Sequence, residues 1–114
     1  MSRKAAVNEE AVNIIRRIIM EEAEKLGIRV EKIILFGSRA RGEAREDSDY
    51  DIIVIVKGWL DRRWRREPAR RIRWRLAEAL IPADIIIAGE KDWEKYKGMV
   101  GHLFHAILEE GVPV

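Results

Sequence analysis

LFGSRARGEAREDSDYDIIVIV, residues 35–56, is the stretch of this sequence that most clearly indicates the fold. One apolar run ends in Gly37-Ser38, ten mostly charged residues follow, and Asp49-Tyr50-Asp51 leads into a second apolar run. Short apolar runs that are rich in branched side chains and bounded by turn residues are typical of buried strands. The stretch therefore predicts two strands joined by a turn, a short helix and a polar loop.

Gly37 and Ser38 have properties that suit phosphate binding. Glycine accepts positive φ angles and lets a ligand approach the backbone closely. Serine is a good N-cap, and the N–H groups at a helix N-terminus attract phosphate. We therefore predict that a short helix begins near Ser38 and that both residues contact a phosphate group.

Arg39 and Arg41 follow this turn directly. Their guanidinium groups could bind phosphate oxygens, or they could equally form salt bridges with Asp47 or Glu43. We keep both arginines as candidate phosphate ligands, with the salt bridges as the alternative.

Asp49 and Asp51 stand two residues apart at the start of the second apolar run. Alternate residues of a strand face the same way, so both carboxylates are expected on one side. Two hard oxygen donors on one face suit Mg²⁺, particularly when phosphate oxygens complete its coordination shell. The alternative is that both are surface residues at a strand end.

The pattern Gly-Ser, ten residues, Asp-x-Asp, with its flanking strands and its Ser-Arg-Ala-Arg-Gly segment, resembles the nucleotidyltransferase superfamily of DNA polymerase β. It is most similar to the minimal nucleotidyltransferases, which are often partners of HEPN proteins in toxin–antitoxin pairs. The resemblance implies an α/β, polymerase β-like fold, in which a small mixed β-sheet is flanked by helices.

The resemblance also implies a set of site residues. Asp49 and Asp51 would bind two Mg²⁺ ions. The nucleotide would be bound by Gly37, Ser38, Arg39 and Arg41. A third carboxylate is expected from a later strand, and Asp84 is the one set in a later apolar run. A charge that enters a buried strand is costly unless it is paired or bound to metal. We predict that Asp84 is catalytic and binds metal; the alternatives are an exposed strand-start residue or a partner of an arginine.

The implied function is Mg²⁺-dependent transfer of AMP from ATP to a HEPN-type toxin, with this chain as the antitoxin in a hetero-oligomer. One alternative is a non-catalytic binding module that neutralises its partner by docking. Another is a nucleotidyltransferase of the aminoglycoside type, with a small-molecule acceptor. A length of 114 residues predicts a single domain over 1–114 and leaves little room for a second substrate-binding lobe.

Composition narrows the possibilities further. The absence of cysteine excludes disulfides and cysteine-based metal sites. No apolar run is long enough to span a bilayer and no signal peptide is visible, so we expect a cytoplasmic protein without membrane contact. The high charge, with no Gln or Thr, hints at a thermophilic source.

Arginine and tryptophan crowd residues 59–75. This segment could bind nucleic acid, dock a partner, or form a solvated helix with its tryptophans in the core. We favour docking or the solvated helix over direct nucleic-acid binding. His102 and His105 are interpreted as ordinary helix residues, because a zinc site would need further ligands.

Periodicity predicts the remaining elements. Strands are expected over 30–36, 49–56 and 83–88, and the second of these is apolar enough to be a central strand covered on both faces. Helices are expected over 9–26, 68–80 and 92–110. Asn8 and Asp92 are the predicted N-caps of the first and last helices, and Pro68 is the predicted start of the middle one.

Overall fold

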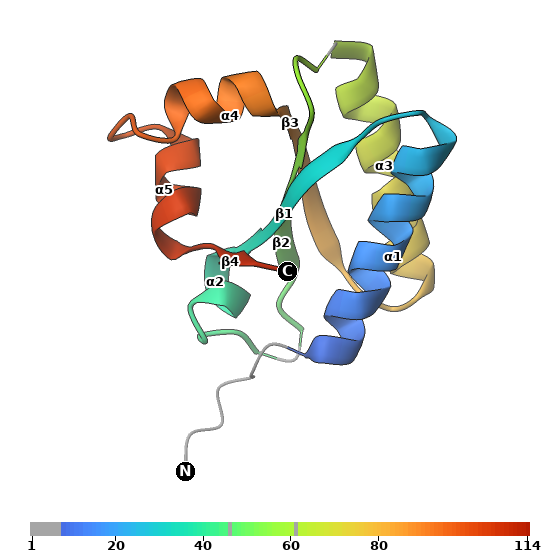
Figure 1. Ribbon diagram of the computed structural model, residues 1–114. Helices are drawn as coiled ribbons and strands as arrows, with labels where there is room; N and C mark the ends of the chain where they lie inside the picture. The colour runs from blue at the N-terminus through green and yellow to red at the C-terminus, as the bar shows by residue number, and fades with distance from the viewer. Residues whose placement is uncertain (1–7, 46, 61) are drawn as a thin grey trace.

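A four-stranded sheet lies between two helical layers (Figure 1). The computed structural model describes residues 8–45, 47–60 and 62–114, and in residues 62–65 it describes the backbone only. In chain order the elements are α1 (Glu9–Lys25), β1 (Val30–Phe36), α2 (Gly37–Ala40), β2 (Tyr50–Val56), α3 (Arg62–Glu78), β3 (Ala83–Gly89), α4 (Glu90–Tyr96), α5 (Leu103–Glu110) and β4 (Val112–Pro113). The predicted α/β fold, a small mixed sheet flanked by helices, is confirmed.

The sheet has the strand order β3-β2-β1-β4. β2 runs parallel to β3 and antiparallel to β1, and β4 is a two-residue strand antiparallel to β1. Six of the seven residues of β2 are buried, which confirms the prediction of a central strand covered on both faces. The parallel pair places the first residues of β2 and β3 side by side at one end of the sheet.

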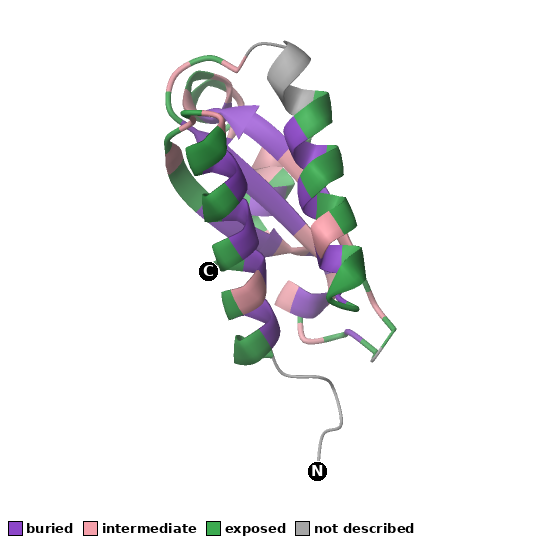
Figure 2. Cartoon of the chain, turned by 90° about the vertical axis from the view of Figure 1, so that its right-hand side faces the viewer, coloured by how far each residue is buried: buried purple, intermediate pink, exposed green. Residues whose placement is uncertain are grey.

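The alternation of strand side chains creates two apolar cores. Ile52 and Val54 of β2 pack in the core beneath α1 and α3, whereas Ile53 and Ile55 pack against α4 and α5. Figure 2 shows that the buried sides of α1 and α3 are turned toward the sheet. Among the described residues, no helix is both long and apolar enough to cross a membrane.

A buried carboxylate joins α1 to α3. The side chain of Glu22 is 1% exposed, and its Oε2 lies 3.1 Å from Lys25 Nζ and 2.9 Å from Arg75 Nη1. Arg71 Nε lies 3.6 Å from the other carboxylate oxygen. Burial alone raises the pKa of the Glu22 carboxyl, but the hydrogen bonds from Lys25 and Arg75 outweigh burial and lower that pKa overall.

The prediction of one helix over 92–110 is wrong. The chain forms α4 and α5 instead, separated by a turn in which Gly101 has a φ of +93°. The N-cap of α5 is His102, whose Nδ1 accepts a 3.0 Å hydrogen bond from the N–H of Phe104. The prediction that Asp92 is the N-cap is also wrong, because α4 begins at Glu90 and its N-cap is Gly89.

The predicted start of the middle helix is also wrong. α3 begins at Arg62, so Pro68 lies inside it rather than at its first position. The residues before the proline are largely arginine and glutamate, which have a high helix propensity. This propensity offsets the one backbone hydrogen bond that is lost because proline has no N–H. The N-cap predicted for α1 is confirmed, since Asn8 Oδ1 accepts a hydrogen bond from the N–H of Ala11 at 3.2 Å.

Candidate active site at the carboxylate edge

The predicted carboxylates gather at one end of the sheet. Asp49 directly precedes β2, and Asp51 and Asp84 are the second residues of β2 and β3. The register pairs Asp51 with Asp84 across the parallel strands. Both share the sheet face of Ile53 and Ile86, which belong to the core under α4 and α5. The two carboxylates therefore point to the same face from neighbouring strands.

Gly37 is fitted closely against Asp51. Phe36 pairs with Asp51 across β1 and β2, so Gly37 stands just beyond that pair. Gly37 has a φ of +74°, and a Cβ atom at this position would collide with the Asp51 Oδ2 atom and lie 3.0 Å from its Cγ. Glycine is thus required here twice, by the backbone conformation and by the space that the carboxylate takes.

The environment of the Asp51 carboxylate favours the binding of a cation. Burial raises the pKa of Asp51, and the negative charges of Asp84 and Asp49 raise it further. Arg41 opposes this effect, and Glu110 adds to it. A divalent cation at this point would relieve both the desolvation and the mutual repulsion.

The side chains at this edge carry the type of ligand atom, carboxylate oxygen, that magnesium prefers. Asp51 and Asp84 supply hard oxygen donors from adjacent strands, and both Asp49 and Asp84 are exposed and accessible. Within the described part of the chain, no three acidic or histidine side chains converge closely enough to form a group of metal ligands as they stand. Mg²⁺ held by these aspartates would take its further ligands from phosphate and water oxygens.

Asp84 is exposed rather than buried. The argument that its charge enters a buried strand is therefore wrong for this residue, since Asp84 stands at the solvent-facing start of β3. Its pairing with Asp51 is what places it at the site.

Arg39 is used to hold the loop before β2. Its side chain is buried, with Nε 3.0 Å from the carbonyl oxygen of Ser48 and Nη2 3.2 Å from that of Arg45. The guanidinium also stacks over the ring of Tyr50 at 4.1 Å. These contacts fix the backbone that leads into Asp49.

Arg41 and Gly37 share a carboxylate that the sequence analysis did not identify. Glu110, the last residue of α5, lies 3.2 Å from Arg41 Nη1 and accepts a 3.4 Å hydrogen bond from the N–H of Gly37. Arg41 also forms a 3.1 Å salt bridge with Glu43, which was the predicted alternative to phosphate binding. Glu110 thus contacts the same groups that are predicted to bind phosphate. No local signal could reveal it, because it lies far along the chain.

Ser38 lies inside α2, whose N-cap is Phe36 without a side-chain hydrogen bond. The prediction that Ser38 caps this helix is therefore wrong, because the turn begins one residue earlier at Gly37.

The Arg/Trp-rich segment is only partly described. Trp59 and Trp74 are largely exposed, which contradicts the interpretation that the tryptophans of this segment lie in the core. The side chain of Trp64 lies outside the described residues. His102 caps α5, and His105 Nδ1 lies 2.9 Å from the carbonyl oxygen of Lys97, so both have structural contacts.

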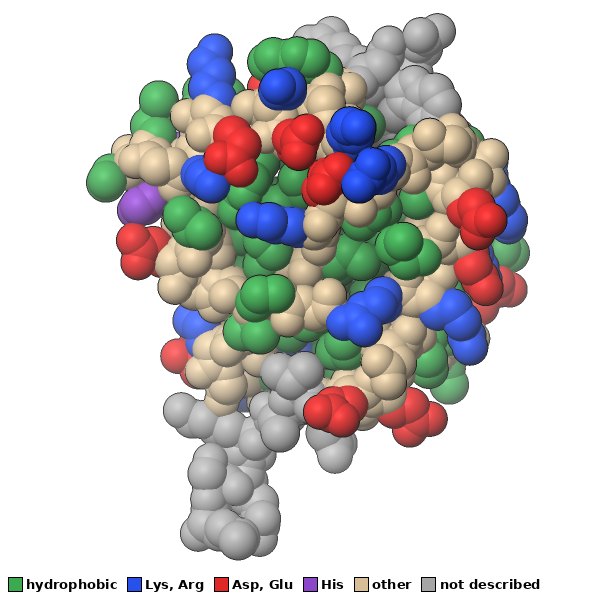
Figure 3. Space-filling view, viewed as in Figure 1, with side chains coloured by type: hydrophobic (Ala, Val, Ile, Leu, Met, Phe, Trp, Pro, Cys, Tyr) green, Lys and Arg blue, Asp and Glu red, His purple; other side chains and the backbone are tan. Residues whose placement is uncertain are grey.

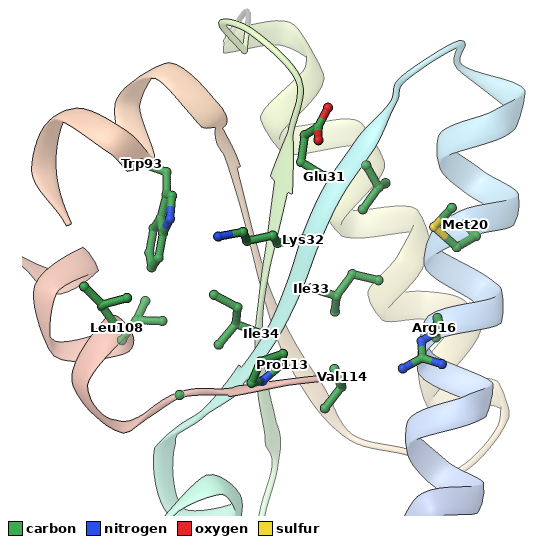
Figure 4. A pocket seen from close by; sticks show the side chains of 13 residues that line it. Arg16, Met20, Glu31, Lys32, Ile33, Ile34, Trp93, Leu108, Pro113 and Val114 are labelled. Atoms are coloured by element: carbon green, nitrogen blue, oxygen red, sulfur yellow. The ribbon is translucent and has the colours of Figure 1, made fainter.

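A cavity of about 570 Å³ lies away from the carboxylates, beside β1 where β4 does not cover it. Trp93 and Leu108 line it from one helical layer and Arg16 and Met20 from the other (Figure 4). Figure 3 shows hydrophobic side chains gathered in the middle of this face, among charged ones. None of the predicted site residues lines this cavity, so it is separate from the carboxylate edge.

Comparison with known proteins finds a matching family model and several similar proteins. The model of the nucleotidyltransferase domain family matches residues 15–101, which is most of the chain and includes the turn at Gly37 and all three aspartates. Three proteins of Methanocaldococcus jannaschii with the provisional name of protein adenylyltransferase are similar over shorter stretches. One is 42% identical over 59 residues, covering 52% of this chain and 40% of the relative. Another is 43% identical over 49 residues, covering 43% of this chain and 47% of the relative.

The third is 38% identical over 48 residues, 42% of this chain and 48% of the relative. The chain therefore spans about half, or somewhat less, of the length of the curated relatives it matches.

Solved structures share the fold. A toxin–antitoxin crystal structure with AMP-PNP is 24% identical, with a TM-score of 0.55, over 85% of this chain and 69% of that one. A mutant of the toxin–antitoxin MntA-HpeT is 20% identical, with a TM-score of 0.58, over 89% and 69%. At these identities the likeness concerns the fold. The family match and the carboxylate edge together establish that this chain belongs to the nucleotidyltransferase domain family.

Proposed function

We propose that this chain transfers AMP from ATP to a hydroxyl group of a partner protein. The observation that carries the proposal is the pairing of Asp51 with Asp84 on one sheet face, directly against the glycine at position 37. Burial and the charges of Asp84 and Asp49 raise the pKa of Asp51, and such a carboxylate beside a glycine turn suits a metal-bound triphosphate. Membership of the nucleotidyltransferase domain family supports the same reaction class.

Each residue has a role in this proposal. Asp49, Asp51 and Asp84 would hold two Mg²⁺ ions, and the backbone at Gly37 and the hydroxyl of Ser38 would bind the β- and γ-phosphates. When bound, Mg²⁺ supplies charge neutralisation of the triphosphate and of the leaving group. Arg41 would turn toward phosphate in exchange for its ion pairs with Glu110 and Glu43. Arg39 acts by holding the loop that carries Asp49.

The chemistry is a single displacement at phosphorus. The acceptor oxygen forms a bond to the α-phosphorus, the bond from that phosphorus to the bridging oxygen breaks, and pyrophosphate leaves with the electron pair. Asp84 takes the proton of the acceptor hydroxyl. Its exposed position at the start of β3 lets an acceptor approach it from solvent.

We further propose that the partner is a HEPN-type toxin and that this chain is its antitoxin in a hetero-oligomer. Two kinds of finding support this: relatives provisionally named protein adenylyltransferases, and a fold shared with toxin–antitoxin structures.

The test is mass spectrometry of the co-purified partner after incubation with Mg²⁺ and ATP. We expect a mass increase of one AMP, or a small multiple, on the partner. The Asp49→Ala/Asp51→Ala variant should form the same complex without the modification. An unmodified partner with the wild-type chain, under conditions in which the complex is intact, refutes the proposal.

A second candidate function is neutralisation by docking alone. The position of Glu110 favours it, because this carboxylate already occupies the N–H of Gly37 and the guanidinium of Arg41. In that case the Asp49→Ala/Asp51→Ala variant neutralises the toxin in cells as well as the wild type does. If the variant loses neutralisation while keeping the complex, docking alone is excluded.

A further inference from the structure

β3 has an open edge that leads to Asp84. Among the described strands it pairs with β2 alone, so its other side ends the sheet. The carbonyl of Pro82 bonds to the N–H of Tyr50 at 2.9 Å and therefore faces β2. In a parallel ladder the direction alternates, so Asp84 and Ile86 also direct their backbone groups to β2. The N–H and C=O groups of Ile85 and Ile87 consequently point outward, where an added strand could pair with them.

A row of cations follows this edge. Arg66, Arg70 and Arg73 of α3 are exposed, and together with Ile85–Ile87 they line a groove of about 500 Å³. Their spacing of four and three residues places them on one side of the helix. Arg70 has a weak 3.5 Å pair with Glu67, and its side chain is 72% exposed. A strand edge thus lies beside a strip of positive charge.

We propose that this edge docks an extended, acidic segment of the acceptor polypeptide, which adds to β3 as an antiparallel strand. The inference rests on the proposed function and names the class of acceptor that the site takes. Backbone pairing would give affinity and the arginine row would give the preference for acidic side chains. A second copy of this chain fits the edge poorly, because pairing β3 with β3 would set one arginine row against the other.

The register of an added strand determines the sequence pattern of the acceptor. A residue opposite Asp84 would have its side chain on the face shared by Asp84 and Asp51, where AMP is transferred. Because Asp84 directs its backbone groups to β2, this would be a non-hydrogen-bonded pair, the kind with the closer side chains. The acceptor hydroxyl belongs at that position.

Residues opposite Ile85 and Ile87 would point to the other face, toward α3 and its arginines. These positions call for Asp or Glu. Read from its N-terminus, the acceptor pattern is acidic, any residue, acidic, hydroxyl.

The test compares two peptides of equal length, one containing Glu-Val-Glu-Tyr and one containing Lys-Val-Lys-Tyr. AMP transfer from labelled ATP is measured with Mg²⁺, and binding is measured by fluorescence anisotropy without ATP. We expect the wild type to prefer the acidic peptide by about tenfold or more in kcat/KM, the scale of one to two charge pairs. The Arg70→Glu/Arg73→Glu variant should reverse the preference, whereas a matched Arg16→Glu/Arg17→Glu variant on α1 should retain it.

The outcomes separate this inference from the proposed function. Transfer to both peptides at equal rates, or a preference that survives Arg70→Glu/Arg73→Glu, overturns the docking edge and leaves the proposed function standing. Charge-dependent binding without transfer to any acceptor supports the edge and contradicts the proposed function. Binding of single-stranded RNA that the variant abolishes, with neither peptide bound, assigns the arginine row to nucleic acid and overturns the inference. Circular dichroism checks the fold of both variants, and the peptide comparison on the wild type needs no variant.

Discussion

Replacing Gly37 by alanine should disable the site, and it should destabilise the fold more than the same change at Gly42. The left-handed backbone at Gly37 costs an L-residue about 1–2 kcal/mol. Gly42 has a similar φ of +72°, but a Cβ atom there meets nothing within 4 Å. The two substitutions therefore share the backbone cost, and only Gly37→Ala forces the carboxylate of Asp51 to move.

The magnitudes can be compared directly. Gly42→Ala should lower the free energy of unfolding by about 1–2 kcal/mol, which is about 4–8 °C in Tm for a domain of this size. Gly37→Ala should add up to about 1–2 kcal/mol more, because the Cβ atom of Asp51 would also lie only 3.2 Å from the new methyl group. The larger effect should be on Mg²⁺-dependent ATP binding, which we expect Gly37→Ala to weaken strongly and Gly42→Ala to leave nearly intact.

Thermal unfolding by circular dichroism and isothermal titration with Mg²⁺ and ATP measure these two effects. In an Asp51→Ala background the collision is mostly removed, so the two glycine substitutions should there cost nearly the same stability. ATP binding by Gly37→Ala as tight as that by Gly42→Ala would refute the close fit of Gly37 against Asp51.

Three further predictions concern charged groups. Glu22→Ala should lower the free energy of unfolding by about 1–3 kcal/mol at neutral pH in urea denaturation, because Arg75 loses its buried partner; an effect below that of an ordinary surface substitution would contradict it. Asp51→Asn should stabilise the metal-free protein at neutral pH. The pKa of Asp51 is raised in the folded protein, so wild-type stability falls as the pH rises from the usual aspartate pKa through the folded-state pKa. That advantage should vanish in acid, and denaturation curves at several pH values would show no such convergence if the idea is wrong. Glu110→Gln should tighten ATP binding by about three- to tenfold in titration calorimetry, since it removes one carboxylate that competes with phosphate for Arg41; weaker binding would instead give Glu110 a part in holding the site.

The sequence predicted the central parts of the fold because they depend on local patterns. The continuous apolar run after Asp51 indicated a central strand, and β2 is that strand. Glu22 could also have been found in this way, since it interrupts the apolar stripe of α1 at a helical spacing. The exact ends of helices were less predictable, as the division of residues 92–110 at Gly101 shows. Glycines such as Gly98 and Gly101 can either weaken a helix or end it, and the sequence does not show which.

The site was predictable where residues close in sequence carry it, and beyond them for Asp84, which the family resemblance pointed to. Asp49, Asp51 and Gly37 lie within one stretch, whereas the contact of Glu110 with Gly37 joins residues 73 positions apart. The role of Arg39 was missed for a different reason: whether an arginine binds a ligand or a loop carbonyl depends on its burial, and the sequence does not show burial directly. β4 has two residues, one of them proline, and so gives no periodic signal.

The most direct test of the account follows the phosphorus atoms of ATP. The complex of this chain with its partner would be incubated with Mg²⁺ and ATP labelled in either the α- or the γ-phosphate, and label on the partner would be counted. Nucleotidyl transfer predicts that only the α-label reaches the partner, that the γ-label leaves in pyrophosphate, and that Asp84→Asn abolishes the transfer. Appearance of the γ-label on the partner, or full transfer of the α-label by Asp84→Asn, would contradict the roles assigned to the carboxylate edge.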